Sequence, residues 1–326
     1  MDKLAFITGN TFVYWTSIVY CLACATAICF FLAFYLNKTG NAAAGFAAIP
    51  LSIVLGIVLS RFVHWYSRSD SYSGFLAAMS EYTYGGYALI GVFAGCLLAA
   101  SLLRLIHLHS SIGAMLDSMC LAGGAGIAVG RLASLFNGSA RGQIIQSIKS
   151  LPIVYPVTNV VSGATEYRLA TFMLQAVAAL LIFIFLSVYY VKHLNRIKEG
   201  DICLIFLLIY CASQVVLDST RYDSLFFRSN GFVSIVQVFS ALALALAIVI
   251  FSVRMVKQRG FRWWNIPLWI LIAAGMGCAG FMEYYVQRHG DQALIAYSIM
   301  SVCLCGVVLL ALLIRMLGEK NETKIA

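Results

Sequence analysis

Long apolar runs separated by short polar segments dominate the pattern along this chain. A transmembrane helix needs about 20 consecutive, mostly apolar residues, and nine runs approach or exceed that length. The predicted transmembrane helices cover residues 12–36, 43–66, 84–106, 112–136, 169–192, 201–218, 230–254, 265–286 and 293–315. The pattern therefore predicts an all-α integral membrane protein with about nine transmembrane helices.

The composition agrees with this prediction. The chain has 326 residues, of which 62% are hydrophobic and 11% are charged, whereas soluble domains carry about 25% charged residues. The net charge is +9, but the positive residues lie in the short segments between apolar runs. That placement is typical of membrane topology rather than of a nucleic-acid-binding surface, so we expect no nucleic-acid partner.

Basic residues also predict how the chain is oriented. They cluster after the fifth and seventh predicted helices and after the last one, at Lys192, His193, Arg196, Lys198, Arg254, Lys257, Arg259, Arg262, Lys320 and Lys324. Short basic segments stay in the cytoplasm. With nine helices, the N-terminus is then expected outside and the C-terminus in the cytoplasm.

The ten cysteines do not indicate a redox or metal centre. Almost all of them fall inside predicted helices, where a thiol behaves as a small hydrophobic group. Cys21 and Cys24 form a C-x-x-C pair, but neither a second such pair nor a histidine pair accompanies it. We therefore expect no metal site and no cofactor.

Ionisable and amide residues inside or beside the apolar runs carry most of the functional information. A charged residue at the centre of a transmembrane helix costs roughly 2.5–3.5 kcal/mol on insertion scales, so such residues usually face an internal cavity. The residues in question are Arg61, His64, Asp117, Arg131, Asn137, Gln214, Asp218 and Arg221. Six of them end the second, fourth and sixth predicted helices, which all run outward. We expect a polar cluster open to the outer face, suited to an anionic ligand.

The polar stretch between the fourth and fifth predicted helices, residues 137–168, is too long for a simple connector. It is a candidate active-site segment. Its beginning overlaps the most specific string of the chain, residues 130–143, which read GRLASLFNGSARGQ.

This string resembles the signature GRxGNFxNxExxGR of bacterial prolipoprotein diacylglyceryl transferases. Gly130-Arg131, Asn137-Gly138 and Gly142 match in spacing. Ser134, Ser139 and Gln143 stand where the family has asparagine, glutamate and arginine.

Two further segments support the resemblance. Residues 210–221, YCASQVVLDSTR, are similar to the family pattern YGxxRxxxExxR, with Gln214 at the middle arginine. Residues 56–64, GIVLSRFVH, are similar to the second-helix pattern GxRxxYV with a shifted glycine. The resemblance covers about residues 10–256. It implies a seven-helix transferase-like core, residues 1–256, and an appended two-helix region with a short cytoplasmic tail, residues 257–326.

The resemblance implies transfer of a diacylglyceryl group from phosphatidylglycerol to a cysteine thiol of a prolipoprotein signal peptide, in the bacterial cytoplasmic membrane. Glycerol phosphate is the leaving group. Arginines suit this chemistry because a guanidinium binds phosphate in a bidentate manner and stabilises charge on the leaving group. By resemblance, Arg131 holds the lipid phosphate and Asn137 orients it, while Asp218 and Arg221 shape the opposite wall.

The candidate catalytic residues are Arg131, His64 and Gln214. The candidate substrate-binding residues are Arg61, Asn137, Gly138, Gly142, Tyr210, Asp218 and Arg221. Gly86 falls at the family's histidine, and His64, one helical turn from Arg61, is a candidate replacement base because the thiolate is the nucleophile.

Several alternatives stay open at this point. Arg131 could pair with Asp117, and Asp218 could pair with Arg221 three residues later. Glu283 could extend to the outer interface, as long polar side chains near helix ends do. The protein could also be a family member without transfer activity that binds phospholipid or lipoprotein as a membrane module or complex subunit. A transporter or partner subunit is a third possibility, suggested by the two extra helices.

Overall fold

The structure is a computed structural model that describes residues 3–9, 11–81, 86–109, 111–145, 153–158, 163–194, 197–226, 233–289 and 292–319. The chain forms two compact units. Unit 1 comprises Met1–Phe206 and Thr220–Gly231, and unit 2 comprises Leu207–Ser219 and Phe232–Ala326. The helix that crosses from one unit to the other is α8, Asp201–Ser219.

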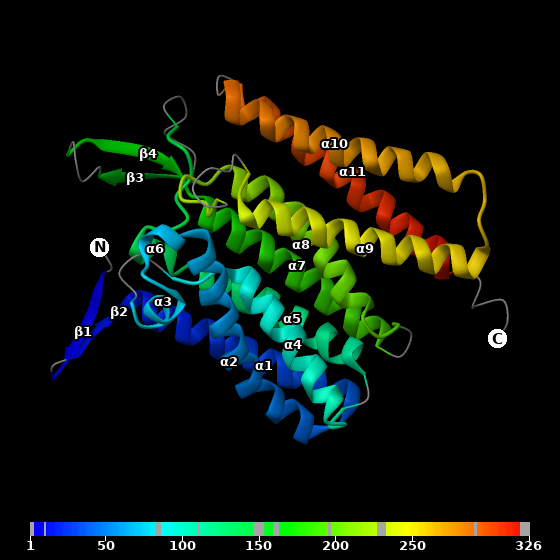
Figure 1. The fold of residues 1–326 in the computed structure, drawn as a ribbon, viewed down its shortest axis with the longest axis horizontal. Coiled ribbons are helices and arrows are strands. Elements are labelled where there is room, and N and C mark those ends of the chain that lie inside the picture. The colour runs from blue at the N-terminus through cyan, green and yellow to red at the C-terminus, as the bar shows by residue number, and fades with distance from the viewer. Residues whose placement is uncertain are drawn as a thin grey trace. The chain divides into compact units, whose positions relative to one another are not determined.

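Unit 1 is built around long apolar helices: α1 (Trp15–Thr39), α2 (Ala42–Ser67), α4 (Leu89–Leu105), α5 (Ile112–Arg131) and α7 (Thr171–His193). The shorter elements are the 3-10 helix Ser69–Ser71, α3 (Phe75–Ser80), α6 (Ser134–Asn137) and the strands β1 (Leu4–Thr8), β2 (Thr11–Tyr14), β3 (Val154–Thr158) and β4 (Thr165–Leu169). The strands form two antiparallel hairpins, β1–β2 and β3–β4. Figure 1 shows both hairpins, α3 and α6 at the same end of the unit 1 helices.

Unit 2 contains most of α8 together with α9 (Ile235–Arg259), α10 (Asn265–His289) and α11 (Ala293–Glu319). Helix α11 packs against both α9 and α10. Ser234 starts α9 through a capping box, in which its hydroxyl accepts from the Gln237 amide and the Gln237 side chain accepts from the Ser234 amide. The indole of Trp269 donates to the Ser252 hydroxyl at 3.2 Å, which links α10 to α9.

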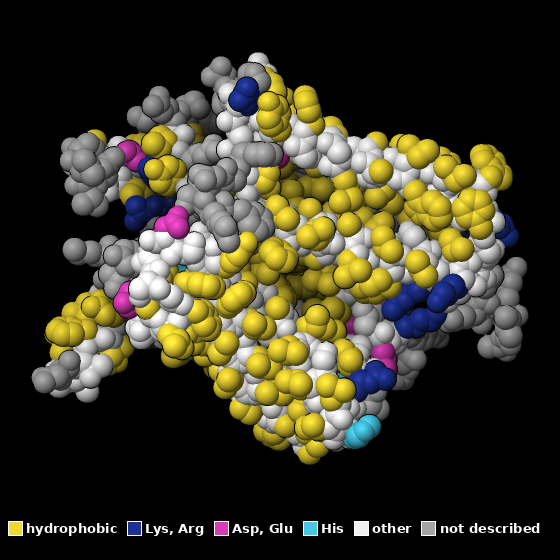
Figure 2. All heavy atoms as spheres, viewed as in Figure 1, with side chains coloured by type: hydrophobic (Ala, Val, Ile, Leu, Met, Phe, Trp, Pro, Cys, Tyr) yellow, Lys and Arg dark blue, Asp and Glu magenta, His cyan; other side chains and the backbone are white. Residues whose placement is uncertain are grey.

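The prediction of an all-α multi-pass membrane protein is confirmed. In the described part of the chain, eight helices are long and apolar enough to cross a membrane, and α4 is a shorter apolar helix. Exposed large side chains follow one side of α7, among them Leu181, Phe185 and Val188. Figure 2 shows the same character on the helices of the visible face, where hydrophobic side chains cover the surface. Such a surface requires lipid around it.

Several predicted helix boundaries are wrong, including those of the seventh helix, which was expected at 230–254 and is α9, Ile235–Arg259. For two of the predicted starts, hydrogen bonds explain the difference. The first helix was expected from residue 12, but residues 11–14 pair with β1 as strand β2. The third was expected from residue 84, but α4 begins at Leu89. Before it, the Ser60 hydroxyl donates to the Ala88 carbonyl at 2.8 Å, and the Ala88 amide donates to the Ser60 carbonyl at 3.3 Å. These bonds to α2 replace the bonds that a longer helix would make.

The expected alternative of an Asp117–Arg131 pair is also wrong. Asp117 is fully buried, and its carboxylate accepts from the amides of Gly200 and Cys203, both at 2.9 Å, where α8 begins. The Lys38 ammonium lies 3.7 Å from the same carboxylate. Arg131 lies 14 residues further along α5, about 21 Å at the usual rise per residue. Asp117 therefore holds the start of α8 against α5.

Helices α2 and α4 pack with their backbones in close contact. A Cβ atom on Gly95 would lie 2.5 Å from the amide nitrogen of Gly56, and one on Gly91 would overlap the backbone of Ser60. Membrane helices approach this closely where small residues line the interface. The glycines of this pair are therefore required by packing.

We expect Gly95→Ala to lower the melting temperature of the protein in detergent. The added methyl group meets backbone atoms, which cannot rotate away, and overpacking of this kind costs about 1–3 kcal/mol. The matched control is Gly123→Ala in α5, where a Cβ would meet nothing within 4 Å. Because alanine favours a helix over glycine by about 1 kcal/mol, the control should be neutral or slightly stabilising. Equal melting temperatures for both variants would contradict the proposed close packing.

Candidate functional site

The turn after α5 positions the signature segment. The amide of Ala133 donates to the Gly130 carbonyl at 3.1 Å, and α6 follows directly. Gly138 ends α6 with φ +66°, and its amide donates to the Ser134 carbonyl at 2.9 Å. This left-handed conformation favours glycine, because other residues crowd their Cβ atom there. Gly138 thus reverses the chain immediately after Asn137.

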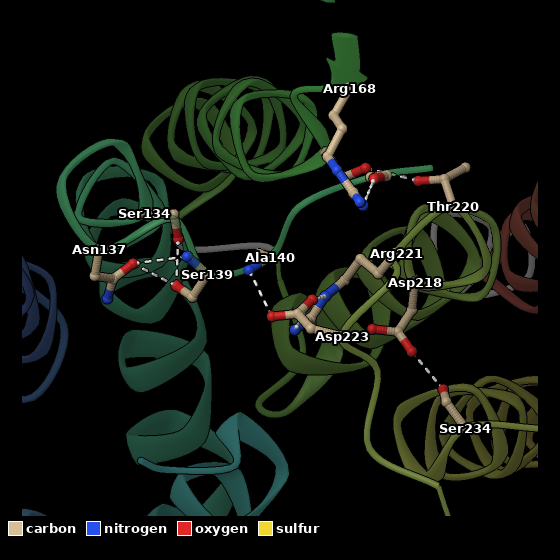
Figure 3. A network of polar contacts seen from close by, with 12 residues as sticks. Ser134, Asn137, Ser139, Ala140, Arg168, Asp218, Thr220, Arg221, Asp223 and Ser234 are labelled. Carbon is tan, nitrogen blue, oxygen red and sulfur yellow. Dashed lines mark hydrogen bonds and ion pairs between the residues drawn. The ribbon is translucent and has the colours of Figure 1, made fainter. Parts of the chain in front are cut away.

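Asn137 and two serines form a local network in this turn. The side-chain oxygen of Asn137 accepts from the Ser139 amide at 2.9 Å and from the Ser139 hydroxyl at 2.7 Å. The hydroxyls of Ser134 and Ser139 are 3.0 Å apart. Figure 3 shows the Asn137 oxygen directed at Ser139. Within the described residues the Asn137 amide nitrogen makes no hydrogen bond, so it can donate to a ligand.

Residues 141–143 follow as a segment whose backbone is bonded on both sides. The Gly142 amide donates to the Leu169 carbonyl at 2.9 Å, and the Gln143 amide donates to the Thr220 carbonyl at 3.1 Å. Gly142 also forms an isolated antiparallel bridge with Arg221. A Cβ atom on Gly142 would lie 2.6 Å from the Leu169 carbonyl oxygen. Close backbone packing is thus a sufficient reason for a glycine at this position.

Asp223 is a residue that the sequence interpretation missed. One of its carboxylate oxygens accepts from the Ala140 amide at 2.8 Å, and the other lies 3.1 Å from the Arg221 guanidinium. Asp223 therefore fastens the segment after Gly138 to the segment after α8 (Figure 3). The signal available in the sequence was a carboxylate two residues after Arg221, outside the matched pattern. Asp218, the partner that was considered for Arg221, accepts a hydrogen bond from the Ser234 hydroxyl within unit 2.

A second arginine pairs with a carboxylate on the β3–β4 hairpin. The Arg168 guanidinium lies 2.7 Å from the Glu166 carboxylate and 4.9 Å from the centre of the Tyr222 ring. The hydroxyls of Thr171 and Thr220 are 2.9 Å apart. These contacts join the hairpin and the start of α7 to the segment after α8.

Arg131 and Arg141 differ from these paired arginines. Among the residues that the structure describes, neither side chain makes a hydrogen bond or an ion pair with a carboxylate. Arg131 is the last residue of α5 and is half-buried. Arg141 lies after the turn and is also half-buried, and its Nε is buried without a hydrogen-bond partner. Signature segment 130–143 therefore carries two positive charges that no described carboxylate neutralises.

Arg61 and His64 lie at the end of α2, in unit 1. Arg61 is 1% exposed, and its guanidinium donates to the carbonyls of Gly86 at 2.8 Å, Glu81 at 2.5 Å and Ala78. His64 is buried with its ring against Tyr72, the ring centres 6.3 Å apart. Arg61 thus connects α2 to α3 and to the chain before α4. The imidazole makes no hydrogen bond with any described residue.

The remaining predicted site residues belong to unit 2. Tyr210, Gln214 and Asp218 are all buried, with Gln214 at 2% exposure. The Gln237 side chain donates to the Val215 carbonyl at 3.2 Å, next to the capping serine of α9. The predicted site residues are therefore divided between the two units, with Arg61, His64, Arg131, Asn137, Gly138, Gly142 and Arg221 in unit 1 and Tyr210, Gln214 and Asp218 in unit 2.

Glu283 does not extend to an exposed interface as expected. It is 5% exposed, and its carboxylate accepts from the Gln287 side chain at 3.1 Å on the same helix. The prediction that the Glu283 side chain reaches an exposed interface is therefore wrong, because this side chain is buried within the packed helices.

Arg61→Ala should unfold at a lower temperature than the unchanged protein. The substitution leaves three backbone carbonyls without their charged donor, and charged hydrogen bonds contribute about 1.5–3 kcal/mol each. We expect a loss of about 3 kcal/mol or more, measured by thermal unfolding in detergent. Arg68→Ala, at the exposed C-cap of α2, is the control and should change little. A melting temperature for Arg61→Ala equal to that of the control would refute a structural role.

Asp223→Ala should loosen the segment after Gly138. The Ala140 amide loses its acceptor. We expect the free energy of local opening to fall by about 1.4 kcal/mol, which makes amide hydrogen exchange about tenfold faster. Hydrogen–deuterium exchange of a peptide covering residues 138–145 measures this change. Asp70→Ala, at an exposed aspartate in the 3-10 helix, is the control. Unchanged exchange in both variants would show that Asp223 does not hold the segment.

Comparison with known proteins identifies the family to which this chain belongs. A protein from Lactococcus lactis subsp. cremoris (strain MG1363), named phosphatidylglycerol--prolipoprotein diacylglyceryl transferase, is 28% identical over 215 residues, which cover 65% of this chain and 77% of that protein. A protein of the same name from Streptococcus sanguinis (strain SK36) is 24% identical over 207 residues, which cover 61% and 77%. Residues 3–253 match the family described as prolipoprotein diacylglyceryl transferase. The chain belongs to this family.

Proposed function

We propose that this protein transfers a diacylglyceryl group from phosphatidylglycerol to the cysteine thiol of a prolipoprotein signal peptide. The observation that carries the proposal is Arg131, a half-buried guanidinium without a described carboxylate partner. It lies at the start of segment 130–143, inside the part of the chain that matches the family. Asn137 supports it with an amide nitrogen available to donate within the same turn. Together they offer donors and positive charge to a phosphate.

The reaction requires one bond to form and one to break. The cysteine thiol gives up its proton, and the thiolate sulfur attacks the glycerol carbon that carries the phosphate ester. The carbon–oxygen bond breaks, the electron pair stays on the phosphate oxygen, and glycerol phosphate leaves while a thioether forms. Arg131 stabilises the charge on the departing phosphate, and preorganised donors of this kind commonly contribute 10²–10³-fold in rate. Asn137 fixes the orientation of the same group.

The proton acceptor that we propose is His64. Its imidazole is buried near the end of α2 and has no hydrogen bond to the described residues. At the position that resembles the family's histidine stands Gly86, whose carbonyl accepts from Arg61. Arg221 is a further proposed substrate-binding residue of unit 1. For unit 2 by itself, we propose that Tyr210, Gln214 and Asp218 bind substrate, with Gln214 as a neutral hydrogen-bond donor.

The proposed setting is the bacterial cytoplasmic membrane, with the reaction at the outer leaflet. The basic segments after α7 and α9 favour a cytoplasmic location for those ends. The N-terminus then lies outside and the C-terminus inside. We treat residues 1–256 as the transferase-like core and residues 257–326 as an appended region, in line with a family match that ends at residue 253.

A second candidate function is lipid or lipoprotein binding without transfer. Gly86 and Gln214, at the positions that resemble the family's histidine and middle arginine, favour it because neither can supply a base or a charge. This candidate keeps the same phosphate contact at Arg131 and differs only in the absence of turnover.

The test is a transfer assay with purified protein, phosphatidylglycerol and a peptide that contains a lipobox cysteine. The unchanged protein should form thioether-linked lipid, and Arg131→Gln should lower the rate by about 10²–10³-fold. Arg104→Gln, at an exposed arginine in the last turn of α4, is the control and should keep the full rate.

Two outcomes decide between the candidates. Phosphatidylglycerol that co-purifies with the unchanged protein and is lost in Arg131→Gln, without any thioether product, would support binding alone and reject transfer. Full transfer activity in Arg131→Gln would reject the phosphate role of this arginine.

A further inference from the structure

After the signature turn, unit 1 contains a second group of polar atoms that have no hydrogen-bond partner among the described residues. The Arg141 side chain folds back over Gly138, close enough that a methyl group on Gly138 would overlap its guanidinium. Its Nε is buried and makes no hydrogen bond to the described residues. A buried N–H without an acceptor is unfavourable, so a ligand that supplies an acceptor would stabilise this arrangement.

Tyr155 on β3 provides a second such donor. Its hydroxyl is buried and has no hydrogen-bond partner within the described ranges, and its ring packs edge-on against Phe172 with centres 5.6 Å apart. Burial raises the pKa of Tyr155 above the usual value of 10.0, while the nearby charges of Arg141 and Arg168 lower it. The hydroxyl therefore keeps its proton at neutral pH and can donate it to an acceptor. Tyr155 also packs against the buried cluster of Ala140, Ala170 and Phe172, so it lies next to the residue that precedes Arg141.

The pairing of charges around these two residues is uneven. Arg168 pairs with Glu166, and Arg221 pairs with Asp223. Arg141 has no carboxylate partner among the described residues. Of these three arginines, Arg141 is therefore the one whose charge no described carboxylate neutralises, and it directly follows Ala140, against which Tyr155 packs. This combination suits an anion that has several acceptor oxygens.

We propose that Arg141 and Tyr155 form a phosphate-binding subsite, distinct from the contact made by Arg131. A planar guanidinium binds two phosphate oxygens at once, and the phenol hydroxyl donates to a third. The subsite takes either the phosphodiester of phosphatidylglycerol or the monoester of the glycerol phosphate that is released. The inference rests on the proposed function for the identity of these ligands, but its test does not require turnover.

The position of Arg141 relative to Arg131 gives the subsite its role. The two arginines flank the α6 turn, Arg131 before it and Arg141 after it. Arg131 serves the phosphate in the reacting lipid, and Arg141 binds the phosphate as substrate enters or as product leaves. Arg141 is therefore a binding residue that affects affinity and product inhibition more than the chemical step.

The experiment measures binding of two probes to the full chain in detergent. Phosphatidylglycerol binding is measured by native mass spectrometry, with diacylglycerol as the lipid that lacks phosphate. Glycerol phosphate is titrated as a competitor of the bound lipid. The variants are Arg141→Gln, Arg141→Lys and Tyr155→Phe, and Arg104→Gln is the matched loss of an exposed arginine. Melting temperatures within a few degrees of the unchanged protein confirm that each variant is folded.

We expect Arg141→Gln to lower the binding affinity of one or both phosphate probes about tenfold, and Tyr155→Phe to lower it about threefold. Arg141→Lys should lower the affinity less than Arg141→Gln, because the positive charge remains. Diacylglycerol binding and Arg104→Gln should stay unchanged. A loss confined to glycerol phosphate assigns the subsite to the product, and a loss confined to the lipid assigns it to the substrate. Unchanged affinity for both probes in folded Arg141→Gln and Tyr155→Phe overturns the subsite.

The outcome also separates this inference from the proposed function. An unchanged protein that binds phosphatidylglycerol through Arg141 but forms no thioether keeps the subsite and rejects transfer. An unchanged protein that transfers lipid, while Arg141→Gln binds both probes normally, keeps transfer and rejects the subsite.

Discussion

Backbone groups in non-helical segments of a membrane protein must find hydrogen-bond partners, because lipid offers none. This constraint accounts for the contacts of three charged side chains in unit 1. Arg61 donates to three carbonyls around α3 and the chain before α4. Asp117 accepts two amides where α8 begins, and Asp223 accepts the amide of Ala140. Each charged side chain thus bonds backbone amides or carbonyls that have no partner within a regular helix.

The same constraint separates structural charges from those available to a ligand. Arg61, Arg168 and Arg221 are engaged by carbonyls or carboxylates, whereas Arg131 and Arg141 have no such partner in the described chain. In the proposed function and the proposed subsite, these two guanidinium groups, on either side of the α6 turn, bind the phosphate of an anionic lipid. Glycines make the turn possible, through the left-handed backbone of Gly138 and the close packing of Gly142. The proposed function therefore depends on a segment that backbone hydrogen bonds hold in place at Gly138, Gly142 and Gln143.

Sequence motifs alone could not distinguish these two kinds of charge. Arg61 and Arg131 both end apolar helices and both align with family patterns, yet one is enclosed by carbonyls and the other is not. Asp223 and Tyr155 lie outside every matched pattern, and they become relevant only because β3, β4 and the segment after α8 meet residues 140–143. Asp117, considered as a partner of Arg131, caps a helix that begins more than 80 residues later in the chain.

The sequence by itself determined the membrane class, the approximate helices, the family and the signature segment, because apolar length and motif spacing are local properties of the chain. It also placed Arg131, Asn137 and Gly138 in one turn, since they are near neighbours. The tertiary structure decided which charges are already paired, because pairing joins residues far apart in sequence. It also decided where α4 begins and that the Arg141 side chain lies against Gly138. Those outcomes depend on hydrogen bonds and contacts between segments, which no local pattern encodes.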